Sequence, residues 1–286
     1  MTAVTSWRAA ALLLAAVLLS LPLAARAGGP SSAAVAACIR DERCHRTFVA
    51  AHRARGFGAP DNSRAAVAAA VKAGVPVIEV DVRRSRDGEL FVFHDSSLDK
   101  LGAGRGRLVE QSAEEVGRAR LANGETVPRL DEIHAITRGR AVLVLDVKDG
   151  GDAVERVARW LEGRGAPDDG LFFLNTPEKV AAAARLKQRS PGLMLMVRLD
   201  ARLTPESARQ LLGRLPEVFH AAEPDPAHVA RIRALGVKAW VNVGDLEWPP
   251  WPWRRLALGR VLDAGPDFVL TDRAPALMER LGGAPR

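Results

Sequence analysis

Acidic, basic and imidazole side chains gather at the ends of short apolar runs in this 286-residue chain. They are Glu79 and Asp81 within one run, Asp146 and Lys148 at the end of a second, and His52 and Arg53 just after a third. Residues two apart on a strand share a face, so each of the first two pairs would point together. Charges that face inward from an apolar strand are costly unless they are paired or bound to a metal. Three such carboxylates predict a site for a hard divalent cation, Mg²⁺, Ca²⁺ or Mn²⁺, in preference to zinc.

The same side chains could instead form structural ion pairs. Glu79 or Asp81 would then pair with Arg53, and Asp146 with Lys148. If only one such pair were present, a structural ion pair would be the favoured interpretation. The whole set of charged residues favours a functional site, because perturbed charges clustered in a cleft usually mark one.

The runs that carry these residues belong to a repeating strand–helix pattern. Eight apolar runs are expected as strands, at 47–51, 77–82, 141–147, 171–174, 193–199, 218–221, 239–243 and 268–270. Helical periodicity follows most of them, at 63–73, 153–162, 178–187, 205–214 and 227–235. This alternation predicts an α/β fold with a parallel sheet, and eight strands predict closure into a TIM (β/α)8 barrel. Active sites of such barrels lie at the carboxyl ends of the strands, where the charged residues stand.

One further run, Leu90–His94, follows the second strand too closely for a helical crossover. The link contains Asp87-Gly88, a dipeptide typical of two-residue hairpin loops, so residues 77–94 are expected to form a β-hairpin. With this loop, Asp81 lies opposite His94. Directly opposed residues share a face, so the hairpin is predicted to place a carboxylate and an imidazole side by side.

The chain divides into a signal segment, a short extension and the barrel. Residues 1–27 combine an early arginine, an apolar run and an Ala25-Arg26-Ala27 cleavage motif. They predict a signal peptide, and therefore a secreted or periplasmic protein after cleavage near Ala27; the alternative is an uncleaved anchor helix. Residues 28–46 form an N-terminal extension, and 47–286 form the barrel. A segment at about 96–129 lacks a clear barrel strand and is expected as an insertion over the top of the barrel.

Cys38 and Cys44 are the two cysteines of the chain. An exported protein meets an oxidising compartment, which favours a local disulfide. The alternative is two free thiols on a helix, where an i, i+6 pair faces different sides. A bridge therefore requires this segment to be non-helical.

Several short motifs occur in an order that resembles one known family. They are Ala51-His52-Arg53, Glu79-Val80-Asp81-Val82, Arg86-Asp87-Gly88, Phe93-His94-Asp95, Asp146-Val147-Lys148, Ala239-Trp240-Val241-Asn242, Ala264 to Leu270 and Thr271-Asp272. The ordered set, spread over roughly residues 48–286, is similar to the glycerophosphodiester phosphodiesterase family. The resemblance implies a TIM barrel with one divalent cation, Mg²⁺ or Ca²⁺, that cleaves glycerophosphodiesters to glycerol 3-phosphate and an alcohol.

The resemblance also implies a role for each matching side chain. The implied metal ligands are Glu79, Asp81 and Asp146, the acid/base residues His52 and His94, and the phosphate-binding cations Arg53 and Lys148. Further candidates for contact with the metal or the substrate are Asp61, Asn62 and Trp240. One histidine would remove a proton from the attacking hydroxyl or water and the other would protonate the leaving alkoxide, with His94 favoured as the acid and His52 as the base.

The sequence departs from the family pattern at several of these positions. Ala54 stands where a glycine is usual, and Asp61 and Asp146 stand where glutamates are usual. The segments Leu98–Gly102 and Leu174–Thr176 also differ. Two shortened carboxylates put the identity of the metal and of the substrate in question.

The remaining features bear on partners. The net charge is +7, and without Arg8 and Arg26 of the signal segment it is +5, which helps to attract anionic substrates. The preferred interpretation is an arginine-rich composition with solvated charges, and scattered arginines without an aromatic-basic module argue against a nucleic-acid partner. The Trp248–Trp253 loop, at the same barrel face, is either a stiff packed loop or a transient contact with a membrane surface. The alternative functions are a phosphodiesterase for lysophospholipids or another phosphodiester, and a secreted phosphate-ester binding protein without turnover.

Overall fold

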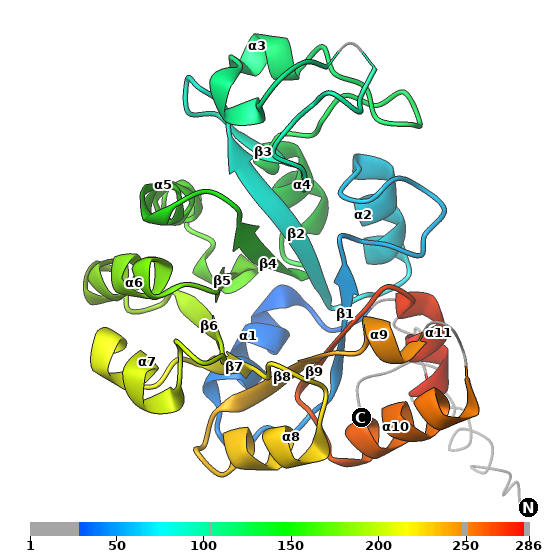
Figure 1. Cartoon of the computed structure of the whole chain (residues 1–286), viewed down its shortest axis with the longest axis vertical. Coiled ribbons are helices and arrows are strands. Elements are labelled where there is room, and N and C mark those ends of the chain that lie inside the picture. The colour runs from blue at the N-terminus through cyan, green and yellow to red at the C-terminus, as the bar shows by residue number, and fades with distance from the viewer. Residues whose placement is uncertain (1–28, 103, 248–250, 283–286) are drawn as a thin grey trace, which may run out of the picture.

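Eight parallel strands close into a barrel in the computed structural model, which describes residues 29–102, 104–247 and 251–282 (Figure 1). The barrel strands are β1 Phe48–His52, β2 Val77–Arg84, β4 Val142–Val147, β5 Gly170–Leu174, β6 Met194–Arg198, β7 Val218–His220, β8 Lys238–Asn242 and β9 Phe268–Thr271. Closure is made by β1, which pairs in parallel with both β2 and β9. The predicted TIM barrel is confirmed, with a strand in each of the eight apolar runs.

A ring of helices covers the outside of the barrel (Figure 1). It consists of α2 Arg64–Lys72, α4 Leu130–Thr137, α5 Gly151–Glu162, α6 Pro177–Arg189, α7 Pro205–Leu212, α8 Pro226–Arg233, α10 Pro252–Asp263 and α11 Ala274–Arg280, with the short α9 Gly244–Glu247 before α10. The starts of α6, α7 and α8 follow one rule: Thr176, Thr204 and Asp225 cap the helix with a side-chain oxygen, and proline occupies the first turn. No helix in the described part of the chain is long and apolar enough to cross a membrane.

The hairpin after β2 forms, but its register differs by one residue from the predicted one. Its second strand is β3 Leu90–Val92, and Val82 pairs with Val92. The loop therefore has three residues, 86–88, with Gly88 at φ +88° closing it. Phe93 N–H donates to the carbonyl of Asp81 (2.9 Å), so Phe93, and not His94, lies opposite Asp81. The expected pairing of Asp81 with His94 is wrong.

The longer loop has a physical cause in the side chains around it. The hydroxyl of Ser85 accepts the N–H of Glu89 (3.0 Å) and donates to Asp87 (2.5 Å). The Asp87 carboxylate also accepts the N–H of Ala113 (3.0 Å), at the start of α3 Ala113–Val116. Asp87 is thus tied to a segment far along the chain, which favours the three-residue loop.

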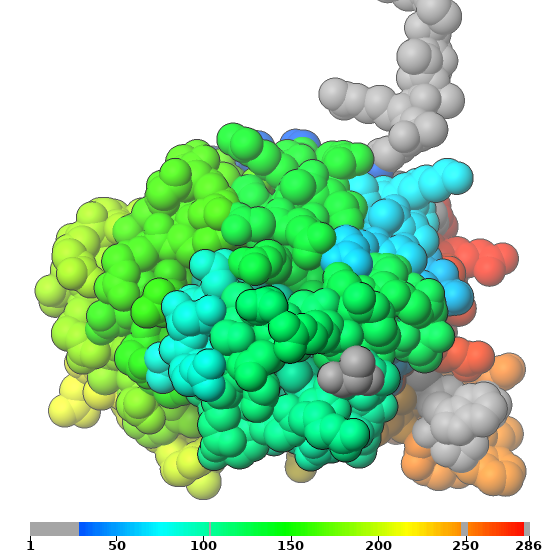
Figure 2. Space-filling model, turned by 90° about the horizontal axis from the view of Figure 1, so that it is seen from above, coloured from blue at the N-terminus to red at the C-terminus, as the bar shows by residue number. Residues whose placement is uncertain are grey.

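The insertion after β3 packs around a small core of its own. Its elements are the 3-10 turn Leu108–Glu110 and α3, and its core includes Phe91, Leu98, Leu108 and Val116. It extends from the end of the β2–β3 hairpin to one side of the barrel, and Figure 2 shows it as a continuous lobe on the face seen there. None of its described residues lines the cavity at the barrel mouth. The insertion therefore follows the hairpin as expected, but its described residues do not reach the mouth cavity.

The N-terminal extension forms a helix, α1 Ser32–Arg40, that closes the amino-terminal end of the barrel. Val35, Ala36 and Ile39 are buried in one cluster with interior residues such as Phe48 and Val77. A disulfide joins Cys38 to Cys44. The helix ends at Arg40, so Cys44 lies beyond it and the bridge does not require two cysteines on one helix.

Candidate active site

Three buried carboxylates meet where β2 and β4 approach the barrel mouth. Asp81 and Asp146 are register partners on the two strands, and Glu79 lies two residues before Asp81 on the same face. Their exposed fractions are 0 to 6%, and one oxygen from each lies within 4.8 Å of the others. Burial, and then the charges of Asp81 and Asp146, raise the pKa of Glu79 well above its ordinary value. The structure therefore brings together the three predicted metal ligands.

Two cations offset part of this negative charge. Lys148 Nζ lies 2.7 Å from Asp81 Oδ1 and also hydrogen-bonds Asp146. Arg53 Nε lies 3.1 Å from Asp81 Oδ2, which also accepts from Asn62 Nδ2 (2.7 Å). Burial alone would lower the pKa of Lys148, but the charges of Asp146 and Asp81 raise it above its ordinary value. The ion pairs considered from the sequence do form, as parts of one cluster.

The cluster retains acceptor capacity that suits a hard cation. Asp146 Oδ1 is buried and has no hydrogen-bond partner among the described residues. A buried carboxylate oxygen without a partner is uncommon and costly. When all three carboxylates are ionised, their charge exceeds that of the two cations by one, and a bound divalent cation would favour this ionised form of Glu79. Oxygen donors alone, gathered in this way, fit a divalent cation of the Mg²⁺ or Ca²⁺ type.

His52, at the end of β1, is held by a carboxylate that follows β9. His52 Nδ1 lies 2.6 Å from Asp272 Oδ1, and Arg55 Nη1 binds the other oxygen of Asp272 (2.8 Å). The hydrogen bond to His52 is the largest cause that lowers the pKa of Asp272 to about 2. Asp272 is therefore ionised at neutral pH and can only accept, so His52 Nδ1 carries the proton and Nε2 faces the mouth, 3.9 Å from Glu79.

Asp272 belongs to one of the sequence motifs, but no role was predicted for it. Its signal was present, because it follows the last strand of the barrel directly. Its partner His52 stands 220 residues away in the sequence, and only barrel closure joins the two.

The loop between β1 and α2 adopts a backbone that few side chains favour. Arg53, Ala54 and Asn62 have φ of +54°, +53° and +62°. This conformation directs the N–H of Arg53 to Glu79 Oε2 (3.1 Å) and Asn62 toward Asp81. It also explains the glycine that is usual at position 54, because a Cβ is strained there. Backbone strain of this kind clusters at functional sites.

Two predicted site residues stand farther from the carboxylates. Asp61 forms an ion pair with Arg55, through Arg55 Nε (3.0 Å), and its oxygen is 4.0 Å from Arg53. His94 lies beyond β3, with Nδ1 2.8 Å from Asp95 Oδ1, and it does not line the mouth cavity. The one-residue shift in the hairpin leaves it outside this cavity and partly exposed, and the Asp95 carboxylate orients its ring as Asp272 orients His52.

A cavity of about 260 Å³ occupies the barrel mouth. One side presents His52, Glu79, Asp146 and Lys148, and the other presents Arg198, His220, Trp240 and Asn242. Burial, and then the charge of Arg198, lower the pKa of His220 to about 4, so this imidazole is neutral at neutral pH. The Nδ1 atom of His220 is buried without a hydrogen bond among the described residues.

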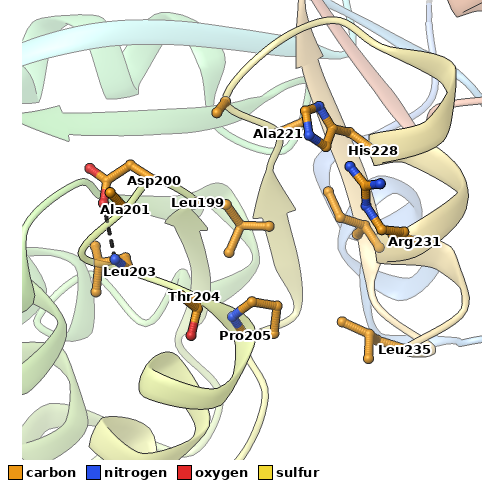
Figure 3. A pocket seen from close by; sticks show the side chains of 12 residues that line it. Leu199, Asp200, Ala201, Leu203, Thr204, Pro205, Ala221, His228, Arg231 and Leu235 are labelled. Carbon is orange, nitrogen blue, oxygen red and sulfur yellow. Dashed lines mark hydrogen bonds between the residues drawn. The ribbon is translucent and has the colours of Figure 1, made fainter.

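A larger cavity, of about 430 Å³, lies outside the barrel wall between α7 and α8 (Figure 3). Leu199, Pro205, Ala221 and Leu235 give it an apolar lining, with Arg231 at its side. It shares Ala222 with the mouth cavity but contains none of the carboxylate cluster. The polar mouth, although smaller, is therefore the candidate active site.

A closed (β/α)8 barrel with buried carboxylates, two cations and a histidine–aspartate pair at its mouth defines a phosphodiesterase-type barrel. The chain belongs to the glycerophosphoryl diester phosphodiesterase family, whose model matches residues 52–274.

Individual relatives agree with the family assignment. A glycerophosphodiester phosphodiesterase of Caldanaerobacter subterraneus is 31% identical over 113 residues, which cover 37% of this chain and 46% of that protein. The chain thus spans less than half the length of the curated relatives that it matches. A glycerophosphoryl diester phosphodiesterase from Parabacteroides distasonis has the same fold, with a TM-score of 0.72, 19% identity and coverage of 90% of this chain and 93% of that one. An Oleispira antarctica phosphodiesterase, solved with the product sn-glycerol-3-phosphate, aligns with a TM-score of 0.66, 22% identity and coverage of 82% and 96%.

Proposed function

We propose that this protein hydrolyses glycerophosphodiesters to glycerol 3-phosphate and an alcohol. The observation that carries the proposal is the buried cluster of Glu79, Asp81 and Asp146 beside Arg53 and Lys148, in the mouth of a barrel of this family. The related Oleispira enzyme was solved with sn-glycerol-3-phosphate, which is the product that this reaction would give.

The cluster would hold one divalent cation, Mg²⁺ or Ca²⁺, through Glu79, Asp81 and Asp146. When bound, such a cation draws charge from a phosphate oxygen and stabilises the negative charge that develops during hydrolysis. The guanidinium of Arg53 and the ammonium of Lys148 lie beside the carboxylates and would bind the other phosphate oxygens. Asn62 would keep Asp81 oriented through its hydrogen bond.

The two histidine–aspartate pairs would move the protons. His52 Nε2 would take the proton of the attacking hydroxyl or water, while Asp272 holds the ring from the other side. His94, oriented by Asp95, would give a proton to the oxygen of the departing alcohol as its bond to phosphorus breaks. Asp61 and Trp240 would have secondary roles, the first by orienting Arg55 and the second by lining the mouth.

The test is a panel of glycerophosphodiesters, with a lysophospholipid as a further arm. Release of glycerol 3-phosphate is measured with Mg²⁺ or Ca²⁺ added and again with a chelator. The proposal expects release that the chelator abolishes. Release of a phosphorylated alcohol, a strong preference for the lysophospholipid, or binding without turnover would each contradict it.

We further propose that the protein acts outside the cytoplasm, as a secreted or periplasmic enzyme. The predicted signal peptide, residues 1–27, lies outside the described residues, and the Cys38–Cys44 disulfide suits an oxidising compartment. The predicted Trp248–Trp253 loop ends in α10: Trp251 is its N-cap, and Trp253 lies in its first turn. These two side chains are 55% and 61% exposed, which would allow transient membrane contact, and residues 248–250 lie outside the described part of the chain. N-terminal sequencing of the protein from periplasm and medium tests export, and vesicle sedimentation tests membrane contact.

A further inference from the structure

The side of the mouth opposite the carboxylates carries a row of hydrogen-bond donors. Arg198 on β6, His220 on β7 and Trp240 on β8 are consecutive register partners, so their side chains share the inner face at one level of the barrel. All three line the mouth cavity, together with Asn242 at the end of β8. The Phe173 ring, 5.4 Å from the ring of His220, separates this row from Asp146.

The row has polar groups that the described part of the protein leaves without partners. Trp240 is fully buried, His220 is 8% exposed, and neither Trp240 Nε1 nor His220 Nδ1 makes a hydrogen bond there. Arg198, exposed at the end of β6, has no hydrogen-bond or carboxylate partner among the described residues. Buried donors without partners are costly, and they commonly mark a place where a ligand supplies the acceptor.

The charge of the row selects the kind of acceptor. The His220 pKa of about 4 keeps the ring neutral, because burial outweighs the attraction of nearby backbone carbonyls. Arg198 therefore gives the row one full positive charge, and Trp240 adds a neutral donor. A guanidinium with a free planar fork fits a carboxylate or a phosphate better than it fits a hydroxyl or an ammonium.

We infer that Arg198, His220 and Trp240 form a second subsite, which binds an acidic group carried by the alcohol of the substrate. The inference rests on the proposed function, because the phosphodiester at the carboxylate cluster would direct its alcohol across the same cavity. The row thereby selects glycerophosphodiesters with a second anionic group, a carboxylate or a phosphate, over those with a neutral or cationic alcohol.

The test compares two substrates that differ by one carboxylate, glycerophosphoserine and glycerophosphoethanolamine. Arg198→Gln should lower kcat/KM for glycerophosphoserine about tenfold or more, as expected for a lost charge-assisted contact. In the same variant, kcat/KM for glycerophosphoethanolamine should change less than about threefold, since that compound has no carboxylate to contact Arg198. Arg202→Gln is the matched control, because it removes the same charge from the loop after β6, where Arg202 pairs with Asp200 outside the cavity. A third substrate, the glycerophosphodiester whose alcohol is glycerol 3-phosphate, tests whether the subsite binds a phosphate as well as a carboxylate.

A binding measurement separates this inference from the proposed function. Calorimetry with the same two compounds on chelator-treated protein needs no turnover. The wild type should bind glycerophosphoserine more tightly than glycerophosphoethanolamine. Arg198→Gln should lose this preference, and Arg202→Gln should keep it. If the wild type hydrolyses neither compound but binds with this pattern, the proposed function fails and the subsite stands. If Arg198→Gln alters both substrates equally, or if the wild type shows no preference in binding, the subsite is overturned.

Discussion

The carboxylate cluster shows how single residues set the chemistry of the mouth. Asp81 lies beside three partners, Arg53, Lys148 and Asn62, whereas Asp146 has Lys148 alone. Asp81 is therefore the most strongly held of the ligands, although each of the two carboxylates keeps one buried oxygen, Oδ1, without a hydrogen bond among the described residues. The shorter side chain of Asp146, where the family usually has glutamate, makes it the natural position for testing metal binding.

Asp146→Ala should abolish measurable binding of Mg²⁺ and Ca²⁺, because only two carboxylates then remain against two cations. Asp146→Glu should retain binding, since it restores the carboxylate with the length usual in the family. Isothermal titration calorimetry on refolded, chelator-treated protein measures both. An unchanged cation affinity in the alanine variant would show that Asp146 is not a ligand.

His52 and His94 should each be needed for turnover. His52→Ala and His94→Ala are expected to lower kcat by roughly 10² or more, typical of a lost general acid or base. Asp272→Asn should lower kcat by about tenfold or more, because it removes the ionised acceptor that orients His52. Circular dichroism checks that the variants are folded. A His94 variant with near-full activity would exclude the acid role of this residue.

His220 should make the stability of the protein depend on pH. In the unfolded chain its pKa is about 6.5, and in the folded protein it is about 4, so the unfolded state binds more protons between these values. This contribution to stability is complete above about pH 6.5 and is lost as the pH falls toward 4, by about 2 kcal/mol between pH 7 and pH 5. Urea denaturation at pH 7 and pH 5 measures the unfolding free energy, which should change less between the two pH values in His220→Phe than in the wild type. An equal change in the two proteins would contradict the lowered pKa of His220.

At the scale of elements, the β2–β3 hairpin decides where His94 stands. A one-residue shift of register turns a side chain to the other face of a strand, and the three-residue loop makes that shift. His94 is consequently paired with Asp95 outside the mouth cavity, and Phe93 lies opposite Asp81 in its place. The hairpin also carries the insertion, which Asp87 joins to the loop through Ala113.

Gly88→Ala should destabilise the hairpin. Gly88 has φ +88°, where a Cβ is strained, and an added Cβ would meet the guanidinium of Arg156 at 2.9 Å. That side chain can move, so the backbone strain dominates, at about 1 kcal/mol or more. Gly102→Ala, which has no positive φ and an ordinary 3.7 Å contact, is the control and should be nearly neutral. Equal unfolding free energies for the two variants would contradict the loop geometry.

At the scale of the whole molecule, α1 closes the end of the barrel opposite the active site. Ser32 Oγ donates to the buried Asp169 (2.5 Å), which His134 also contacts (2.9 Å). At the other end of α1, Lys238 Nζ donates to the carbonyls of Asp41 (2.8 Å) and Cys44. The extension is therefore part of the barrel fold, fixed at both ends of its helix.

Loss of the disulfide should weaken this closure. A double Cys38→Ala, Cys44→Ala variant should lose about 2 kcal/mol of unfolding free energy in the chain-entropy model. The melting temperature should fall by roughly 4 to 8 °C for a domain of this size. Differential scanning calorimetry measures the shift, and a reductant should produce a similar shift in the wild type but none in the variant. If the variant had the same melting temperature as the wild type, the disulfide would not stabilise the protein.

The sequence predicted the barrel well because its signals are local. Eight apolar runs with helical stretches between them indicate parallel strands, and each run became a strand. The barrel helices α4, α10 and α11 and the closing helix α1 were not predicted, because their patterns of apolar residues are short or weak without the surfaces on which they pack. The carboxylates were found because a charge in an apolar strand is a local anomaly.

The sequence by itself therefore determined the order of strands and the inward position of Glu79, Asp81, Asp146 and Lys148, since alternation along a strand needs no distant contact. Tertiary structure alone decided the hairpin register, which depends on the contact of Asp87 with Ala113. It also decided the pairing of His52 with Asp272 and the alignment of Arg198, His220 and Trp240 into one row. These arrangements join residues from distant strands, and their energies exist only after the barrel has closed.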